Sequence, residues 1–159
     1  MVGVIGIGNI LLQDEGFGVH VINFLNKNYS FNSAEVQLID GSTMGYGLFD
    51  TILNLETAII IDALKTDDKP GSIYKFHDGD LPANLMKKTA HEVEFIDVIT
   101  MCGLTGFTPK LIFFAVVPQN CDNVSMELTE PLKLCIPSVA DDILKELGLF
   151  NITPLRNKQ

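Results

Sequence analysis

The sequence predicts an α/β fold, in which a single three-layer α/β/α domain is built on a twisted, mostly parallel sheet. Apolar runs without polar alternation, at residues 2–5, 57–61 and 111–117, are typical of strands buried on both faces of such a sheet. Segments in which apolar residues recur at helical spacing alternate with strands, which favours parallel pairing. One antiparallel edge strand is expected at residues 72–76, because only a short polar turn connects it to the preceding strand.

The length and the composition indicate one ordinary domain. The chain has 159 residues, of which 47% are hydrophobic and 19% are charged. A chain of this length buries roughly two-thirds of the surface that it exposes when unfolded. We therefore expect one domain over residues 1–159, with a loosely held tail from about residue 154.

The charge excludes two classes of partner. Eleven Lys and Arg residues against twenty Asp and Glu give a net charge of -9, without any basic run. Nucleic acid and anionic membranes are not expected to bind, because phosphate contacts need clustered basic side chains. There is no apolar span of 18 residues and no signal-peptide pattern, so we expect a cytoplasmic protein, and a monomer.

The stretch that follows the first strand carries the first candidate site. Residues 6–18 read GIGNILLQDEGFG. The glycines allow a tight turn, and the apolar residues from Phe17 to Leu25 then recur at helical spacing, with Asp14 in position to cap the helix. Glu15 is thereby expected at the mouth of a strand-to-helix crossover, where open α/β sheets bind their ligands.

Two further strands end at polar residues. The strand at 35–39 is followed by Asp40 and a glycine-rich turn, and the buried strand at 57–61 stops at Asp62. Parallel strands joined by right-handed crossovers have their carboxyl ends at one edge of the sheet. We therefore expect these acidic side chains at the same edge as Glu15.

The second half of the chain predicts two more helices. The first begins at Ala90, so that His91 lies near its start, and it is followed by a loop at 103–109. The second closes the domain at 134–147, with Gly148 as its C-cap.

A dinucleotide site is the first alternative for the glycine-rich turn. Gly6 and Gly8 match the start of a G-x-G-x-x-G motif, but Leu11 occupies the position of its last glycine. Asp40 follows the second strand, where a ribose-binding acid would lie, but at more than the usual ~20 residues. Glu15 would repel a phosphate, so we expect no nucleotide.

A metal-contacting site fits these residues better. The carboxylates of Glu15 and Asp62, with the imidazole of His91, form a ligand set that suits a first-row divalent ion and leaves coordination positions open. His77 competes with His91 on composition, whereas His20 is expected to be a packed, hydrogen-bonded histidine of the first helix.

Other chemistries have weaker support. There is no G-x-S-x-G nucleophile elbow and no H-E-x-x-H helix, and an aspartic-protease pair of Asp40 and Asp62 remains open. The cysteines, spaced too widely for a C-x-x-C pair, are expected to be small buried hydrophobes, with Cys121 as the most exposed of Cys102, Cys121 and Cys135.

Four motifs, in this order, carry a resemblance to a known family. They are GIGNILLQDEGFGV at 6–19, DGSTMG at 40–45, IIIDA at 59–63, and His91 opening a helix that ends in the loop at 103–109. The chain resembles the NiFe-hydrogenase maturation endopeptidases, which trim the hydrogenase large subunit. It departs from the family at Ser42, where the family usually has glycine.

The resemblance implies a twisted sheet of about five strands with helices on both faces. It also implies that nickel, delivered by the substrate, is contacted by Glu15, Asp62 and His91. Carried over residue by residue, the catalytic group comprises Glu15, Asp62 and Asp40. Asp40 would position the substrate or assist the reaction.

The implied reaction is a single cut in the C-terminal region of the large-subunit precursor, after nickel insertion. Two other function classes stay open at this point. One is a non-proteolytic chaperone that holds nickel or the precursor, and the other is a dinucleotide-binding oxidoreductase.

Overall fold

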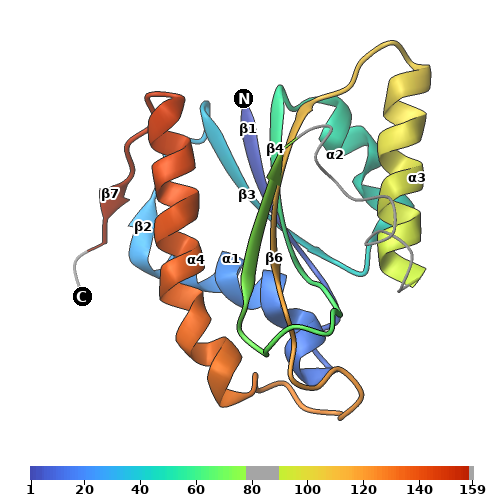
Figure 1. Ribbon diagram of the computed structural model, residues 1–159. Coiled ribbons are helices and arrows are strands. Elements are labelled where there is room, and N and C mark those ends of the chain that lie inside the picture. The colour runs from blue at the N-terminus through green and yellow to red at the C-terminus, as the bar shows by residue number, and fades with distance from the viewer. Residues whose placement is uncertain (78–89, 158–159) are drawn as a thin grey trace.

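The computed structural model describes residues 1–77 and 90–157, with side chains for all of these except 90–96. Its main sheet has five strands in the order β3-β1-β4-β6-β5 (Figure 1). Four are parallel: β1 (Val2–Ile7), β3 (Val36–Ser42), β4 (Thr57–Ala63) and β6 (Lys110–Val116). The fifth, β5 (Ile73–His77), is antiparallel to β6 at the edge, so the predicted fold class and its edge strand are confirmed.

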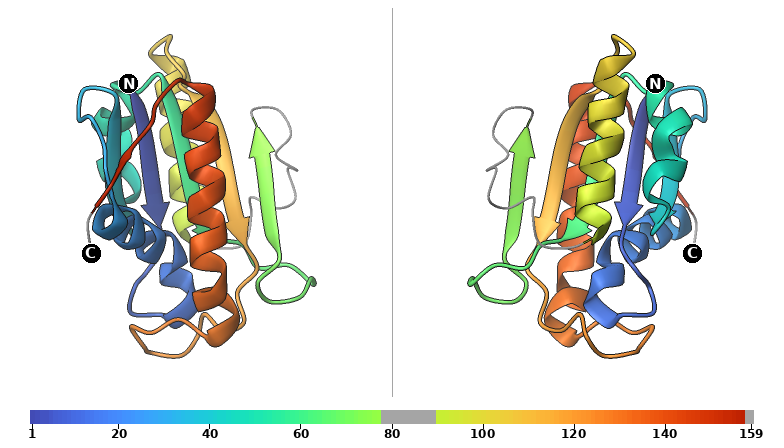
Figure 2. Two further views of the ribbon diagram at one scale, coloured as in Figure 1. Left: turned by 90° about the vertical axis from the view of Figure 1, so that its left-hand side faces the viewer. Right: turned by 90° about the vertical axis from the view of Figure 1, so that its right-hand side faces the viewer.

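Helices cover both faces of the sheet (Figures 1 and 2). On one face lie α1 (Phe17–Asn28) and α4 (Glu130–Leu149), and on the other α2 (Phe49–Leu53) and α3 (Ala90–Leu104). Side chains of a strand point to alternate faces, so β4 supplies both core clusters. Ile59 and Ile61 pack toward α1 and α4, whereas Ala58 and Ile60 pack toward α2 and α3.

Two 3-10 turns connect strands to helices on the carboxyl side of the sheet. The turn η1 (Gln13–Gly16) lies between β1 and α1, and η2 (Gly45–Leu48) lies between β3 and α2. η1 contains Glu15, and η2 comes shortly after Asp40, so each turn lies beside a candidate site residue.

A second, two-stranded sheet was not predicted. β2 (Tyr29–Ser30) pairs antiparallel with β7 (Leu155–Arg156), in the segment that we expected to be a loose tail. Asn157 adds contacts to the end of α1, because its backbone N–H donates to the Asn28 carbonyl at 2.8 Å.

Several helix boundaries differ from the predicted ones. Helix α4 is longer at both ends, and Gly148 lies inside it, so our assignment of Gly148 as the C-cap was wrong. The left-handed residue after this helix is Asn151, with a φ of 61°. No helix within the described residues has the length and apolar character needed to cross a bilayer.

Candidate functional site

The turn that carries Glu15 is packed backbone against backbone. Gly8 has a φ of 126°, and a Cβ atom there would lie 1.7 Å from the Glu15 carbonyl oxygen. A Cβ atom on Gly18 would lie 2.2 Å from the carbonyl oxygen of Ile61 in β4. The glycines thus let the first turn of α1 touch β1 and β4, as expected of a tight turn that presents Glu15 at the strand ends.

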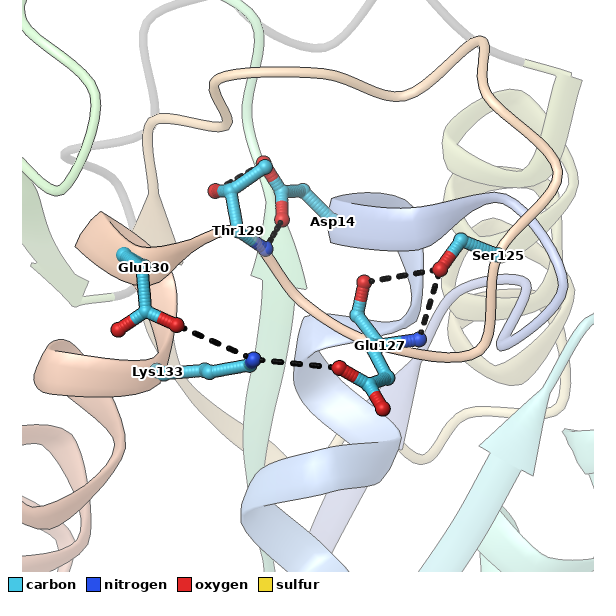
Figure 3. Close-up of polar contacts among 6 residues, drawn as sticks. All are labelled: Asp14, Ser125, Glu127, Thr129, Glu130 and Lys133. Atoms are coloured by element: carbon cyan, nitrogen blue, oxygen red, sulfur yellow. Dashed lines mark hydrogen bonds and ion pairs between the residues drawn. The ribbon is translucent and has the colours of Figure 1, made fainter.

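Asp14 has a different role from the predicted one. Helix α1 begins at Phe17 with Gly16 as its N-cap, so Asp14 does not cap it. Its carboxylate is fully buried and accepts four hydrogen bonds from the loop at 117–129, of which Figure 3 shows those from Thr129. The donors are the backbone N–H groups of Gln119 (2.9 Å), Asn120 (2.9 Å) and Thr129 (2.7 Å), and the Thr129 hydroxyl (2.8 Å).

Asp40 lies at the carboxyl end of β3, beside β1. It pairs in register with Gly6, is exposed, and accepts a hydrogen bond of 2.6 Å from the Ser42 hydroxyl. Ser42 has a φ of 40°, the left-handed region that favours glycine, and its carbonyl accepts from the Gly8 N–H at 2.9 Å. The departure from the family pattern at this position therefore falls on strained backbone that joins the two turns.

Asp62 lies at the carboxyl end of β4, on the other side of β1. One of its carboxylate oxygens accepts from the Ala63 N–H at 2.8 Å. Strand alternation places Asp62 on the face of α2 and α3, with Ile60. Asp40 follows Leu38, which packs toward α1 and α4, so the two aspartates lie on opposite faces of the sheet and the open aspartic-protease pairing loses support.

His91 is the second residue of α3, which begins at Ala90 as predicted. Its side chain lies outside the described set, so the proposed ligand trio of Glu15, Asp62 and His91 stays a prediction. Among the described residues, no group of three His, Cys, Asp and Glu side chains is placed to hold a metal ion.

The register separates His77 from the candidate site. His77 pairs with Ile112, which pairs with Ile59 in β4, whereas Asp62 pairs with Ala115. Measured along the strands, His77 is thus offset from Asp62 by three residues, or ~10 Å. Across the sheet, it lies two strands away from Asp62. This placement favours His91 over His77 as the histidine of the site.

His20 and Cys121 are both packed groups. His20 lies beside the backbone of Met126, and burial lowers the pKa of its imidazole, so the expected packing of this histidine is confirmed. Cys121, which we expected to be the most exposed cysteine, is only 7% exposed, and this expectation was wrong. Burial raises the pKa of its thiol to about 12, and the nearby Glu15, Asp14 and Asp122 carboxylates add to this rise.

Comparison with known proteins identifies the family. The sequence model of the hydrogenase maturation proteases matches residues 19–146. The chain belongs to this family. The matched residues include Asp40, Asp62 and His91 and begin after Glu15.

Individual family members are similar over nearly the whole chain. The Hydrogenase 2 maturation protease of Escherichia coli is 31% identical, over 91% of this chain and 88% of its own length. The hydrogenase expression/formation protein HupD of Rhodobacter capsulatus is 36% identical, over 94% of this chain and 72% of its own. These alignments extend well beyond a single motif.

Solved structures of family members have the same fold. The hydrogenase maturating endopeptidase HybD from E. coli superposes with a TM-score of 0.92 at 28% identity, covering 98% of this chain and 97% of its own. The superposition therefore includes the turn with Glu15. This maturation protease is accordingly a peptidase with the architecture of HybD.

Sequence reasoning missed the link between Asp14 and the loop at 117–129. The polar run at 119–123 and Thr129 carry no pattern that pairs them with residue 14. Adjacent residues of a 3-10 turn point in different directions. This is the one signal that could have suggested that Asp14 is buried beside Glu15.

Proposed function

We propose that this protein removes the C-terminal extension of a NiFe-hydrogenase large-subunit precursor after nickel has been inserted. Its family membership supports a peptidase that acts in hydrogenase maturation. The observation that carries the proposal is the shared edge of the sheet, where Asp40 and Asp62 lie at the carboxyl ends of β3 and β4 and Glu15 lies in the turn after β1, the strand between them. A cytoplasmic location and a monomeric state remain predictions from the sequence.

Glu15, Asp62 and His91 are the residues proposed to contact nickel that the substrate carries. Two carboxylates and an imidazole suit a first-row divalent ion and leave positions for ligands of the precursor. The placement of His91 in the first turn of α3, on the sheet face of Asp62, supports this set. Contact with the ion would fix the position of the scissile bond relative to the catalytic residues, and a precursor without nickel would not be held in place.

Asp40 is proposed to act on the peptide and not on the ion. Its carboxylate is exposed at the end of β3, on the opposite sheet face from Asp62. The hydrogen bond from Ser42 fixes its orientation. From there it can orient the bound peptide or accept a proton during hydrolysis.

The test is a processing assay with purified protein. Nickel-loaded and nickel-free precursor are incubated separately, and the mass of the large subunit is followed. We expect cleavage of the loaded form alone. Equal rates for both forms would refute nickel recognition, and intact precursor in both would refute the peptidase function.

Two histidine variants separate the proposed ligand from its competitor. We expect His91→Ala to abolish processing of the loaded precursor, whereas His77→Ala, two strands from Asp62, should process it at nearly the wild-type rate. The reverse result would show that the ligand assignment is wrong.

A further inference from the structure

An exposed apolar surface lies next to the turn that carries Glu15. Residues Leu12 and Ser125 form a parallel bridge, in which the Ser125 N–H donates to the Leu11 carbonyl at 3.0 Å and the Gln13 N–H donates to the Ser125 carbonyl at 2.8 Å. Leu11, Val124 and Met126 directly adjoin the bridged residues in the sequence, and their exposed fractions are 54%, 85% and 59%. We call these three residues the apolar surface.

This surface is held in place by the chain beneath it. Asp14 binds both ends of the loop at 117–129, through Gln119 and Asn120 at one end and Thr129 at the other. Figure 3 shows the contact with Thr129. The half-buried His20 side chain lies beside the backbone of Met126. The apolar side chains are thus presented outward by a fixed loop, and a partner would not have to order it.

Charged residues around the apolar surface are paired with one another. Lys65 lies 3.6 Å from Asp122, and Lys133 lies 3.3 Å from Glu127, which directly follows Met126. An apolar centre with a polar rim is the usual anatomy of a protein interface. Each lysine of this rim offsets acidic neighbours, so we expect a partner to be recognised here mainly through apolar contact.

We propose that the apolar surface binds an apolar segment of the large-subunit precursor close to the bond that is cut. This inference rests on the proposed function, because it takes the precursor as the occupant. Leu11 and Glu15 belong to one segment, and four residues span at most about 14 Å of chain. A folded substrate that reaches Glu15 therefore covers the apolar surface next to it, which contributes to affinity while Glu15, Asp62 and Asp40 act on the substrate.

The experiment compares two matched double variants in single-turnover processing of nickel-loaded precursor, with enzyme concentration varied. The test variant is Val124→Ser with Met126→Ser. The control is Leu149→Ser with Leu155→Ser, which also removes two exposed apolar side chains, each 75% exposed. Leu149 ends α4, ~30 Å along the helix from Thr129. Neither pair changes the net charge, and thermal unfolding of each variant checks that it is folded.

We expect the half-saturating enzyme concentration to rise at least tenfold in the test variant, with the maximal rate within twofold of wild type. The control should match wild type in both quantities. Leu11→Ser, on the other segment, should raise the half-saturating concentration in the same way.

The outcomes separate this inference from the proposed function. If wild type processes the precursor and the test variant saturates within twofold of wild type, the apolar surface is not a docking site and the proposed function stands. If the maximal rate falls with no change in half-saturation, docking is refuted as well. Wild-type protein that leaves nickel-loaded precursor intact would overturn both.

Discussion

His20 illustrates how burial at a single residue links stability to pH. Its Nε2 atom is buried and, among the described residues, has no hydrogen-bond partner, and burial lowers the pKa of the ring below the ordinary value of 6.5. Between the lowered pKa and 6.5, the unfolded chain therefore binds more protons at this residue than the folded chain does. The contribution of His20 to stability is fully present above pH 6.5 and is lost as the pH falls toward the folded-state pKa.

We predict that the free energy of unfolding declines less steeply from pH 7 to pH 5 in His20→Gln than in wild type. The two slopes should differ by less than 2.303RT per pH unit, which is the value for one proton. Urea unfolding at half-unit pH steps measures both curves. Parallel curves would show that His20 titrates alike in the folded and unfolded states.

At the scale of single residues, the sequence was sufficient to predict the position of some side chains and not of others. Glu15, Asp40 and Asp62 reached the predicted edge because each follows a strand, and strand ends are visible as the end of an apolar run. Asp14 was assigned wrongly because its partners lie more than a hundred residues away in sequence, and a local capping pattern outweighed them.

At the scale of elements, the close approach of α1 to the sheet depends on Gly18. A Cβ atom there would lie 2.2 Å from the Ile61 carbonyl oxygen and 2.5 Å from that of Ile7, and backbone oxygens cannot rotate away. We expect Gly18→Ala to destabilise the protein by about 2–3 kcal/mol through forced overpacking. Urea unfolding measures the change.

Gly148→Ala is the matched control for this substitution. Gly148 lies inside α4, and a Cβ atom there meets nothing within 4 Å. Alanine in a helix should stabilise by about 0.5–1 kcal/mol relative to glycine. Equal effects of the two substitutions would mean that the close contact of α1 with β1 and β4 is unimportant for stability.

Elements were predictable where a local pattern fixed them. The edge strand β5 was found because its connection is too short for a crossover, and α3 because its apolar residues keep helical spacing. The pairing of β2 with β7 was not predictable, since two-residue strands have no periodicity of their own. Gly148 was misplaced because glycine near a helix end usually terminates it, whereas α4 continues to Leu149.

For the whole molecule, one ion pair joins the edge strand to the closing helix. Lys75 of β5 pairs with Glu146 of α4, whose side chain is only 6% exposed, and the Lys75 ammonium lies 5.7 Å from the centre of the Phe114 ring. Removing the lysine leaves a buried carboxylate without its partner.

We expect Lys75→Met to cost about 1–3 kcal/mol, a value kept low because the lysine is partly exposed. Adding Glu146→Leu should restore most of that loss, as a double-mutant cycle in urea would show. Lys145→Met, which breaks the exposed pair with Asp142, should leave the free energy of unfolding unchanged within the error of the measurement. Additive losses in the double variant would indicate that the two side chains are not coupled.

The clamp of Asp14 on residues 119, 120 and 129 also has a consequence for the order in which the protein matures during its own synthesis. Glu15 leaves the ribosome early, but the donors that satisfy the neighbouring carboxylate are made more than a hundred residues later. Until residue 129 has emerged, Asp14 must stay hydrated and its turn cannot close. We therefore expect the nascent chain to keep these acids in an open segment until the loop after β6 docks.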